Sequence, residues 1–188
     1  MRNKQILLGS SSKRRIDLLK SLKLQFEQYS PEIDETCDTS DPIIFTQKIS
    51  KMKFMKCKEV FPNIYTIAAD TVVSFQNIIL GKPSSIYEAK KFLKLLSNRT
   101  HEVITSVCMG YEPHSFTVVS KVEFYPLNDT LLDWYLATNE WYDKAGAYGI
   151  QGFGKVLVKR IIGDYYNIVG LPISEVWNRL LHDKVLIF

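Results

Sequence analysis

Two β-rich segments of similar length follow one another in the middle of the chain, with only three residues between them. Residues 102–111 and 115–125 are rich in β-branched and aromatic side chains, and Glu112-Pro113-His114 separates them. A connection this short suits a pair of long antiparallel strands. The middle of the chain therefore favours a mixed sheet over a strictly parallel one.

Shorter patterns on both sides of this pair alternate between strand and helix. Strands are predicted at residues 5–8, 25–29, 64–69 and 155–162, and a hairpin joins 72–75 to 78–80. Helices are predicted from near 13, from 42, from 86, at 129–137 and at 174–182. The chain is thus expected to be an α/β protein with a mixed, elongated central sheet flanked by helices. We expect one domain over residues 1–188, with the β-rich middle as a second lobe.

Polar residues mark the starts of three of these helices. Ser12 can cap the first helix, Asp41-Pro42 suits the cap and first turn of the second, and Ser85 with Glu88 forms a capping-box pattern. In the second helix Phe45, Ile49 and Met52 are expected on one side. Five lysines at 48, 51, 53, 56 and 58 are expected on its wet side, from which one can point inward.

The composition limits which classes of protein the chain can belong to. The 188 residues are 46% hydrophobic and carry a net charge of +4 that is spread along the chain, which argues against a nucleic-acid partner. The three cysteines have no CxxC spacing, which disfavours disulfides and a thiolate zinc site and fits the cytoplasm. The charged start MRNKQ and the lack of a run of roughly twenty apolar residues predict neither a signal peptide nor a membrane span.

The run Gly9-Ser10-Ser11-Ser12-Lys13-Arg14-Arg15 lies between a predicted strand and a predicted helix. Free backbone N–H groups, hydroxyls and the helix dipole favour an anion there, and guanidinium groups suit phosphate oxygens. The GxxxxGK[ST] spacing of a Walker loop is absent. The alternative is a Ser-capped helix with solvated basic residues.

Carboxylates are a second group of candidates. Asp70 follows the apolar strand 64–69, where burial is costly without a cation, a metal or hydrogen bonds. Lys82 follows the same hairpin and can meet a phosphate beside it. Glu32, Asp34 and Glu35 offer further oxygen ligands for a hard divalent ion such as Mg²⁺. The alternatives are a carboxylate that caps a turn for Asp70 and a solvated loop for the acidic run.

The segment from Trp141 to Gly154 holds four glycines within one short irregular stretch. Glycine permits close backbone approaches, and the amide of Gln151 offers both donors and an acceptor, the combination needed to read the edge of a nucleobase. The alternative is a tight turn packed under Tyr148 and Phe153. Asp143 and Lys144 suit either a structural ion pair or a role in the site.

Six motifs in order resemble the Maf family of nucleotide pyrophosphatases, also called septum-formation inhibitors. They read LLGSSSKRR, AADTVV, LGKP, LSNRTHEV, DKAGAYGIQG and GDYYNIVGLPISE. The resemblance implies an elongated α/β fold like that of inosine triphosphate pyrophosphatases, with two lobes and a cleft between them, and a homodimer. It also implies hydrolysis of nucleoside triphosphates to monophosphates and pyrophosphate with a divalent metal cation, Mg²⁺ or Mn²⁺.

The resemblance also implies roles for individual positions. Asp70 matches the catalytic acidic residue, and Asp34 falls where the family has a second acidic residue near the metal, with Glu32 and Glu35 as close alternatives. Arg14, Thr71 and Gln151 match positions tied to base selectivity in members that act on dTTP and UTP. The phosphate-contacting positions are matched by Ser10, Arg14, Lys53 and Lys82. Lys13 stands where the family commonly has Pro, and Gly9 where it usually has Ala.

The resulting hypothesis is a metal held by Asp70 with Asp34 or a neighbour, while Arg14, Arg15, Lys53 and Lys82 neutralise charge on the leaving pyrophosphate. The substrates expected are dTTP and UTP or modified pyrimidine nucleotides. Three alternatives remain: a nucleotide-binding regulator of cell division without turnover, a broad house-cleaning pyrophosphatase for modified nucleotides, and an RNA- or DNA-binding module.

Overall fold

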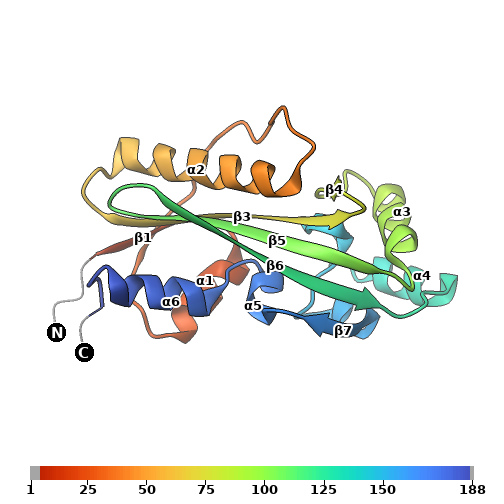
Figure 1. The fold of residues 1–188 in the computed structure, drawn as a ribbon. Helices are drawn as coiled ribbons and strands as arrows, with labels where there is room; N and C mark the ends of the chain where they lie inside the picture. The colour runs from red at the N-terminus through yellow and green to blue at the C-terminus, as the bar shows by residue number, and fades with distance from the viewer. Residues whose placement is uncertain (1–4, 187–188) are drawn as a thin grey trace.

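The computed structural model describes residues 5–186, and within them one seven-stranded sheet runs along an elongated molecule (Figure 1). The strand order is β2-β1-β3-β5-β6-β7, with β4 paired to β3. β1 pairs parallel with β2 and β3, and the remaining pairs are antiparallel, so the predicted mixed sheet is confirmed. The strands are β1 (Ile6–Gly9), β2 (Glu27–Tyr29), β3 (Tyr65–Phe75), β4 (Ile78–Leu80), β5 (Thr100–Gly110), β6 (His114–Phe124) and β7 (Val158–Ile162).

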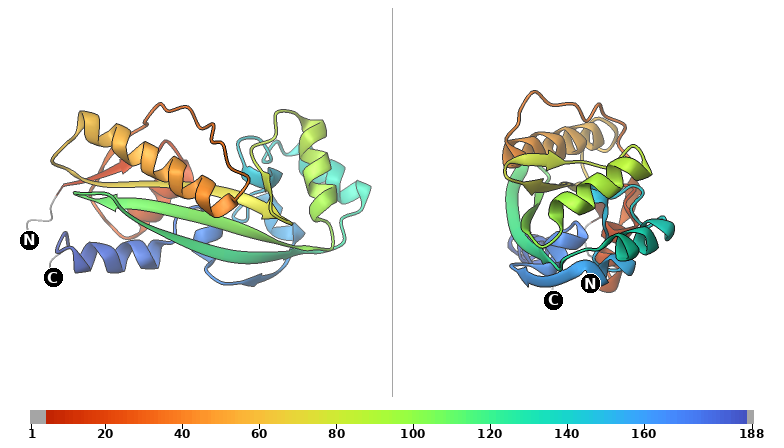
Figure 2. Two further views of the ribbon diagram at one scale, coloured as in Figure 1. Left: turned by 45° about the horizontal axis from the view of Figure 1, so that its top comes forward. Right: turned by 90° about the vertical axis from the view of Figure 1, so that its right-hand side faces the viewer.

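Helices cover the sheet unevenly along its length. Figure 1 shows α2 on one side of the long strands and α1 and α6 on the other, near the end where both termini lie, while α3 and α4 gather at the opposite end. The two further views in Figure 2 show the same arrangement. The helices are α1 (Lys13–Ser21), α2 (Pro42–Val60), α3 (Ile86–Leu96), α4 (Asp129–Ala137), α5 (Tyr165–Val169) and α6 (Ile173–His182), with 3₁₀ turns η1 (Ala145–Ala147) and η2 (Phe153–Leu157).

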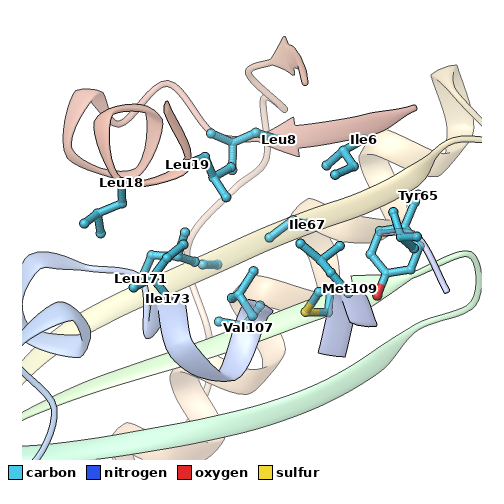
Figure 3. Packing of buried hydrophobic residues seen from close by; sticks show 14 of the residues in the cluster. Ile6, Leu8, Leu18, Leu19, Tyr65, Ile67, Val107, Met109, Leu171 and Ile173 are labelled. Atoms are coloured by element: carbon cyan, nitrogen blue, oxygen red, sulfur yellow. The ribbon is translucent and has the colours of Figure 1, made fainter. Parts of the chain in front are cut away.

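The hydrophobic core is divided into two large clusters that share the long strands. The first packs Ile67 and Ala69 of β3 against α1 and α6, and Figure 3 shows its side chains converging. The second packs Val73 and Phe75, further along β3, against α3 and α4. Asp70 lies on the same strand between the two clusters. The strand that joins the two halves therefore carries a carboxylate at their junction.

The prediction that a strand ends at Asp70 is wrong. β3 continues through Asp70 to Phe75, and Asp70 pairs with Ser106 in the middle of the β3–β5 ladder. The two predicted strands merge because β5 pairs with β3 without a break from Thr66 to Ser74, although the pairing with β1 ends at Ala68. The predicted hairpin is present, and its turn residues Gln76 and Asn77 both adopt positive φ, at 51° and 62°.

Two of the predicted helix caps form as expected. The Asp41 carboxylate accepts hydrogen bonds from the backbone N–H groups two and three residues further on, at 2.8 and 3.0 Å. Ser85 Oγ accepts from the Glu88 N–H at 3.3 Å, and the Glu88 carboxylate returns to the N–H of Ser84 at 2.6 Å rather than to Ser85. Local side-chain chemistry therefore sets where α2 and α3 begin.

Three other local predictions differ from the structure. Met52 is 40% exposed, because the buried face of α2 follows Ile49, Phe54 and Cys57 and leaves Met52 to one side. β7 begins at Val158, since residues 153–157 form the η2 turn. The short helix α5 was not predicted.

The charged residues 1–4 lie outside the described part of the chain. Among residues 5–186, no helix combines the length and the apolar character needed to cross a membrane.

Candidate active site

A cleft of about 860 Å³ lies where the two halves of the molecule meet. This volume is in the range of pockets that hold small organic ligands. Each of the six sequence motifs contributes at least one residue to its lining, although the motifs are spread from residue 7 to residue 175. Of the predicted site residues, only Asp34 does not line this cleft. The lining includes Ser10, Arg14, Arg15, Lys53, Asp70, Thr71, Lys82 and Gln151.

Two carboxylates meet one ammonium group on one wall of the cleft. Lys53 Nζ lies 2.8 Å from Asp70 Oδ1 and 2.8 Å from Glu35 Oε1. α2 carries Lys53, β3 carries Asp70, and the irregular segment between β2 and α2 carries Glu35. We call these three residues the carboxylate–lysine centre. Lys53 is thus the lysine of α2 that turns inward.

The two carboxylates of this centre differ in acidity. Burial raises the pKa of Asp70, although the charges of Lys53 and Arg15 act in the opposite direction. Partial burial also acts to raise the pKa of Glu35, but its hydrogen bond to Lys53 and the nearby charges of Lys53, Lys82 and Arg15 outweigh it and lower that pKa. The inner carboxylate is therefore the weaker acid of the pair.

Among the acidic candidates, the structure places Glu35 rather than Asp34 in the cleft lining. Asp34 is exposed, does not line the cleft, and accepts a hydrogen bond from the Thr36 N–H at 2.9 Å. Glu35, one position further on, faces Lys53 instead. The irregular segment has no periodicity from which the inward side chain can be read. The partner that selects Glu35 lies 18 positions away in the sequence.

Arg15 is held inside the protein by three hydrogen bonds. Its Nε donates to the Gly170 carbonyl at 2.8 Å, Nη2 to Thr71 Oγ1 at 3.0 Å and Nη1 to Ser10 Oγ at 3.2 Å. Burial lowers the pKa of Arg15 to about 10, while Asp70 acts to raise it. Ser10 Oγ also accepts from the Ser12 N–H at 3.2 Å, whereas Ser12 itself makes no side-chain cap. Arg15 thus positions Ser10 and Thr71 within the cleft wall.

Arg14 lies in the cleft lining beside the buried Arg15. Burial lowers the pKa of Arg14, and the carboxylates of Asp143 and Glu140 act to raise it. Lys82 lines the cleft from the segment that follows β4. Cations from three distant parts of the chain therefore face the same space, which suits a polyphosphate.

Residues 141–154, which we call the glycine segment, form another wall. Asp143, Gly146 and Ala147 have φ of +64°, +65° and +63°. A Cβ at Gly146 would lie within 3 Å of Val73, so only glycine fits there. Asp143 and Lys144 form an ion pair at 2.6 Å, and both line the cleft.

A comparison with known families shows which family the chain belongs to. Residues 5–182 match the family model described as Maf-like protein. The chain belongs to the Maf family. The prediction drawn from the six motifs is therefore confirmed.

Curated relatives of this Maf chain have a common name. It is 45% identical over 172 residues to a dTTP/UTP pyrophosphatase of Pyrococcus furiosus, with 90% of each chain covered. It is 43% identical over 183 residues to a dTTP/UTP pyrophosphatase of Thermosipho melanesiensis, covering 96% of this chain and 99% of the relative.

Solved structures resemble this Maf chain more distantly. The Ham1 protein of Staphylococcus aureus matches with a TM-score of 0.48 and 16% identity, over 64% of this chain and 72% of that one. A nucleoside-triphosphatase described as a dITP/XTP pyrophosphatase, from Mycobacterium abscessus, matches with a TM-score of 0.48 and 13% identity, over 97% and 100%.

Glu140 is a polar residue of the Maf cleft that the sequence patterns did not indicate. Its carboxylate accepts hydrogen bonds from the backbone N–H groups of Phe153 and Gly154, and Glu140 also lines the cleft. The alternative of a turn packed under two aromatic rings is half right: Tyr148 is buried, but Phe153 is exposed. No local pattern marks Glu140, because its partners are 13 and 14 residues away.

The oxygen donors of the Maf cleft fit a hard divalent cation. Asp70 and Glu35 already share one cation, the Lys53 ammonium, which shows that both oxygens can face a single positive charge. Within residues 5–186 no group of three or more His, Cys, Asp or Glu residues is placed to hold a metal ion. Mg²⁺ and similar ions are commonly bound by one or two carboxylates and completed by substrate phosphates and water, and Asp70 with Glu35 offers such a pair.

Proposed function

We propose that this chain hydrolyses nucleoside triphosphates to monophosphates and pyrophosphate, with dTTP and UTP as its preferred substrates. The observation that carries the proposal is the meeting of Asp70 with cations from α1, α2 and the segment after β4 in one cleft of about 860 Å³. The names of relatives that are 43–45% identical over at least 90% of the chain support the same reaction.

Asp70 is proposed as the catalytic carboxylate. Its burial raises its pKa, which brings the carboxylate closer to the strength that a general base needs near neutral pH. Asp70 and Glu35 would together hold Mg²⁺ or Mn²⁺, which, when bound, supplies Lewis-acid polarisation of the phosphate. Glu35 takes the place in this proposal that Asp34 held in the sequence-based hypothesis.

The cations of the cleft are proposed to stabilise charge on the leaving pyrophosphate. Lys53, Lys82 and Arg14 line the cleft and can contact phosphate oxygens. Arg15 contributes positive charge without a direct phosphate contact, because each of its three guanidinium nitrogens already donates to a protein oxygen. Ser10 offers a hydroxyl at the start of α1. Most of the catalytic effect expected here is electrostatic.

The glycine segment is proposed to recognise the base. Gln151 lines the cleft, and a primary amide can pair with the donor and acceptor pattern on the edge of a pyrimidine. The Thr71 hydroxyl is hydrogen-bonded to Arg15, and to Thr105 Oγ1 at 2.9 Å. Because its hydroxyl is already engaged, Thr71 is proposed to affect base selectivity through the shape of the cleft wall.

The location and assembly of the protein are part of the same proposal. All three cysteines are free thiols, and Cys57 and Cys108 are buried, which fits a reducing compartment such as the cytoplasm. A homodimer is expected from the family resemblance alone. Sedimentation equilibrium of the purified chain would measure it.

The proposed function is tested by measuring pyrophosphate release from a panel of nucleotides. The panel contains dTTP, UTP, the purine triphosphates and modified pyrimidine triphosphates, each with Mg²⁺ or Mn²⁺. Turnover should be highest for dTTP and UTP, and Asp70→Asn should lower it by about 10²- to 10⁴-fold, since the substitution keeps the shape and removes the charge. Nucleotide binding without any pyrophosphate release would instead support a regulator.

A further inference from the structure

Glu140 holds the backbone of the glycine segment from the side. One of its carboxylate oxygens accepts from the N–H of Phe153, and the other accepts from the N–H of Gly154 at 3.1 Å. A carboxylate that accepts from two successive backbone N–H groups restrains the path of that backbone more than either bond alone would. Gln151 stands only two residues before the first of these groups.

The other end of the same loop is held from α4. Tyr135, in the last turns of this helix, accepts a hydrogen bond at its hydroxyl from the Gly149 N–H at 3.3 Å. Residues 149–154 are therefore fixed near both ends by side chains from the α4 region, with Gln151 between them. Gln151 is exposed and lines the cleft, so the path of this loop sets where its side chain begins.

Glu140 is itself placed by local contacts. Its backbone N–H donates to Thr138 Oγ1 at 3.2 Å, and the neighbouring Trp141 indole donates to the Leu136 carbonyl at 3.1 Å. These bonds close the turn that follows α4. The carboxylate is thus presented from a restrained turn rather than from a free loop.

The absence of a side chain at Gly152 leaves room for the Glu140 carboxylate. A Cβ added at Gly152 would lie 2.0 Å from Glu140 Oε2, closer than any real contact, and one at Gly149 would lie 2.9 Å from Glu140 Oε1. The glycines on either side of Gln151 therefore have a steric reason in the position of Glu140.

The Glu140 carboxylate also faces the same cleft as Arg14. Both residues line the cleft, and Glu140 is one of the two carboxylates whose charge acts on the Arg14 guanidinium. Glu140 thereby connects two positions that are far apart in sequence and that both face the space for the nucleotide.

We propose that Glu140 is a positioning residue for base recognition, which holds the loop of Gln151 at a set place relative to Arg14. The inference rests on the proposed function and extends it to a residue that does not itself need to contact the base. Loss of the carboxylate would free the loop. Discrimination between pyrimidine and purine triphosphates would then fall, while the carboxylate–lysine centre would be left intact.

The test compares kcat/KM for dTTP and UTP with kcat/KM for dATP and GTP in the wild type and in Glu140→Ala. The ratio of pyrimidine to purine values should fall by about 10- to 100-fold in the variant, mainly through a higher KM for the pyrimidines. Glu140→Gln keeps a single acceptor oxygen and should lie between the two. A residue that only stabilised the fold would lower all four values together and leave the ratio unchanged.

Gly152→Ala provides an independent route to the same loss. The added methyl group displaces the flexible end of Glu140 rather than backbone, so the protein should fold and the ratio should fall as in Glu140→Ala. The double variant should be no worse than the worse single variant, because both changes break one interaction. Glu123→Ala is the matched control, since Glu123 pairs with Lys159 and Arg160 outside the cleft and its loss should leave the ratio unchanged.

Hydrogen exchange reports on the loop without any turnover. The amides of Phe153 and Gly154 should exchange faster in Glu140→Ala than in the wild type. If these amides are freed while the pyrimidine-to-purine ratio of the active protein stays unchanged, the inference alone is overturned. If the wild type releases no pyrophosphate from any nucleotide, the proposed function fails and the inference fails with it. If Glu140→Ala does not fold, the ratios of Glu140→Gln and Gly152→Ala decide.

Discussion

The carboxylate–lysine centre and the glycine segment lie on walls of the same cleft but are built in different ways. Asp70 stands in the middle of β3, where it pairs with Ser106 of β5, and Lys53 stands within the 19-residue helix α2. The glycine segment is irregular, has three residues in a left-handed conformation between Asp143 and Ala147, and is held by side chains such as Glu140.

The difference reflects what each wall is proposed to do. Reacting groups need fixed positions, which regular elements provide. A wall that approaches a ligand with its backbone needs glycine, and it must then be held by bonds from elsewhere. The carboxylate–lysine centre contains charges that are expensive to bury, whereas the glycine segment packs its Tyr148 ring against the rings of His101 and Phe124.

The largest effect expected on this comparison comes from neutralising Glu35, and the matched control is the same change at its neighbour Asp34. Glu35→Gln should weaken Mn²⁺ binding and lower kcat/KM by about 10- to 100-fold, because it removes one of the two carboxylates at Lys53. Asp34→Asn should change both quantities by less than about twofold, because Asp34 is exposed outside the cleft. Titration of Mn²⁺ by electron paramagnetic resonance, together with initial rates, measures both. The reverse order of effects would return the second acidic position to Asp34.

A smaller effect tests the buried packing around Tyr148 of the glycine segment. His101 Nε2 lies 2.8 Å from the Tyr148 hydroxyl, and burial lowers the pKa of His101 to about 3. A lowered folded-state pKa means that stability is present above the unfolded-state value, near 6.5, and is lost as pH falls towards 3. Unfolding should therefore become up to tenfold more favourable for each pH unit in this window.

The measurement is urea unfolding between pH 7 and pH 4. His101→Gln should remove this part of the pH dependence whatever its effect on stability at pH 7, since glutamine binds no proton in this range. Tyr148→Phe is the matched control: it removes the hydroxyl partner, retains the buried imidazole and should retain the pH dependence. An unchanged pH dependence in His101→Gln would show that other groups cause it.

The smallest effect concerns the stability of the carboxylate–lysine centre itself. Because the pKa of Asp70 is raised in the folded state, its contribution to stability is complete at low pH and is lost as pH rises through the folded-state pKa. Asp70→Asn should accordingly raise the melting temperature by a few degrees at pH 7 in the absence of metal and nucleotide. The gain should vanish below about pH 4. A lower melting temperature at pH 7 would mean that attraction to Lys53 outweighs burial.

Much of the framework could be predicted from the sequence. The long antiparallel pair, the Asp41 cap and the helix at 129–137 all follow from local patterns, because turn chemistry, capping and hydrophobic periodicity act between residues close in the chain. The six motifs also led to the Maf family, and the structure gathers them around one cleft.

The sequence by itself thus determined most of the helices and strands, the mixed sheet and the set of polar residues available for a site. Only the tertiary structure decided that Glu35 rather than Asp34 meets Lys53, that Arg15 is tied to Gly170, and that Glu140 holds the glycine segment. The physical reason is that an irregular segment imposes no period on its side chains. Which of them turns inward depends on a partner that only folding brings near.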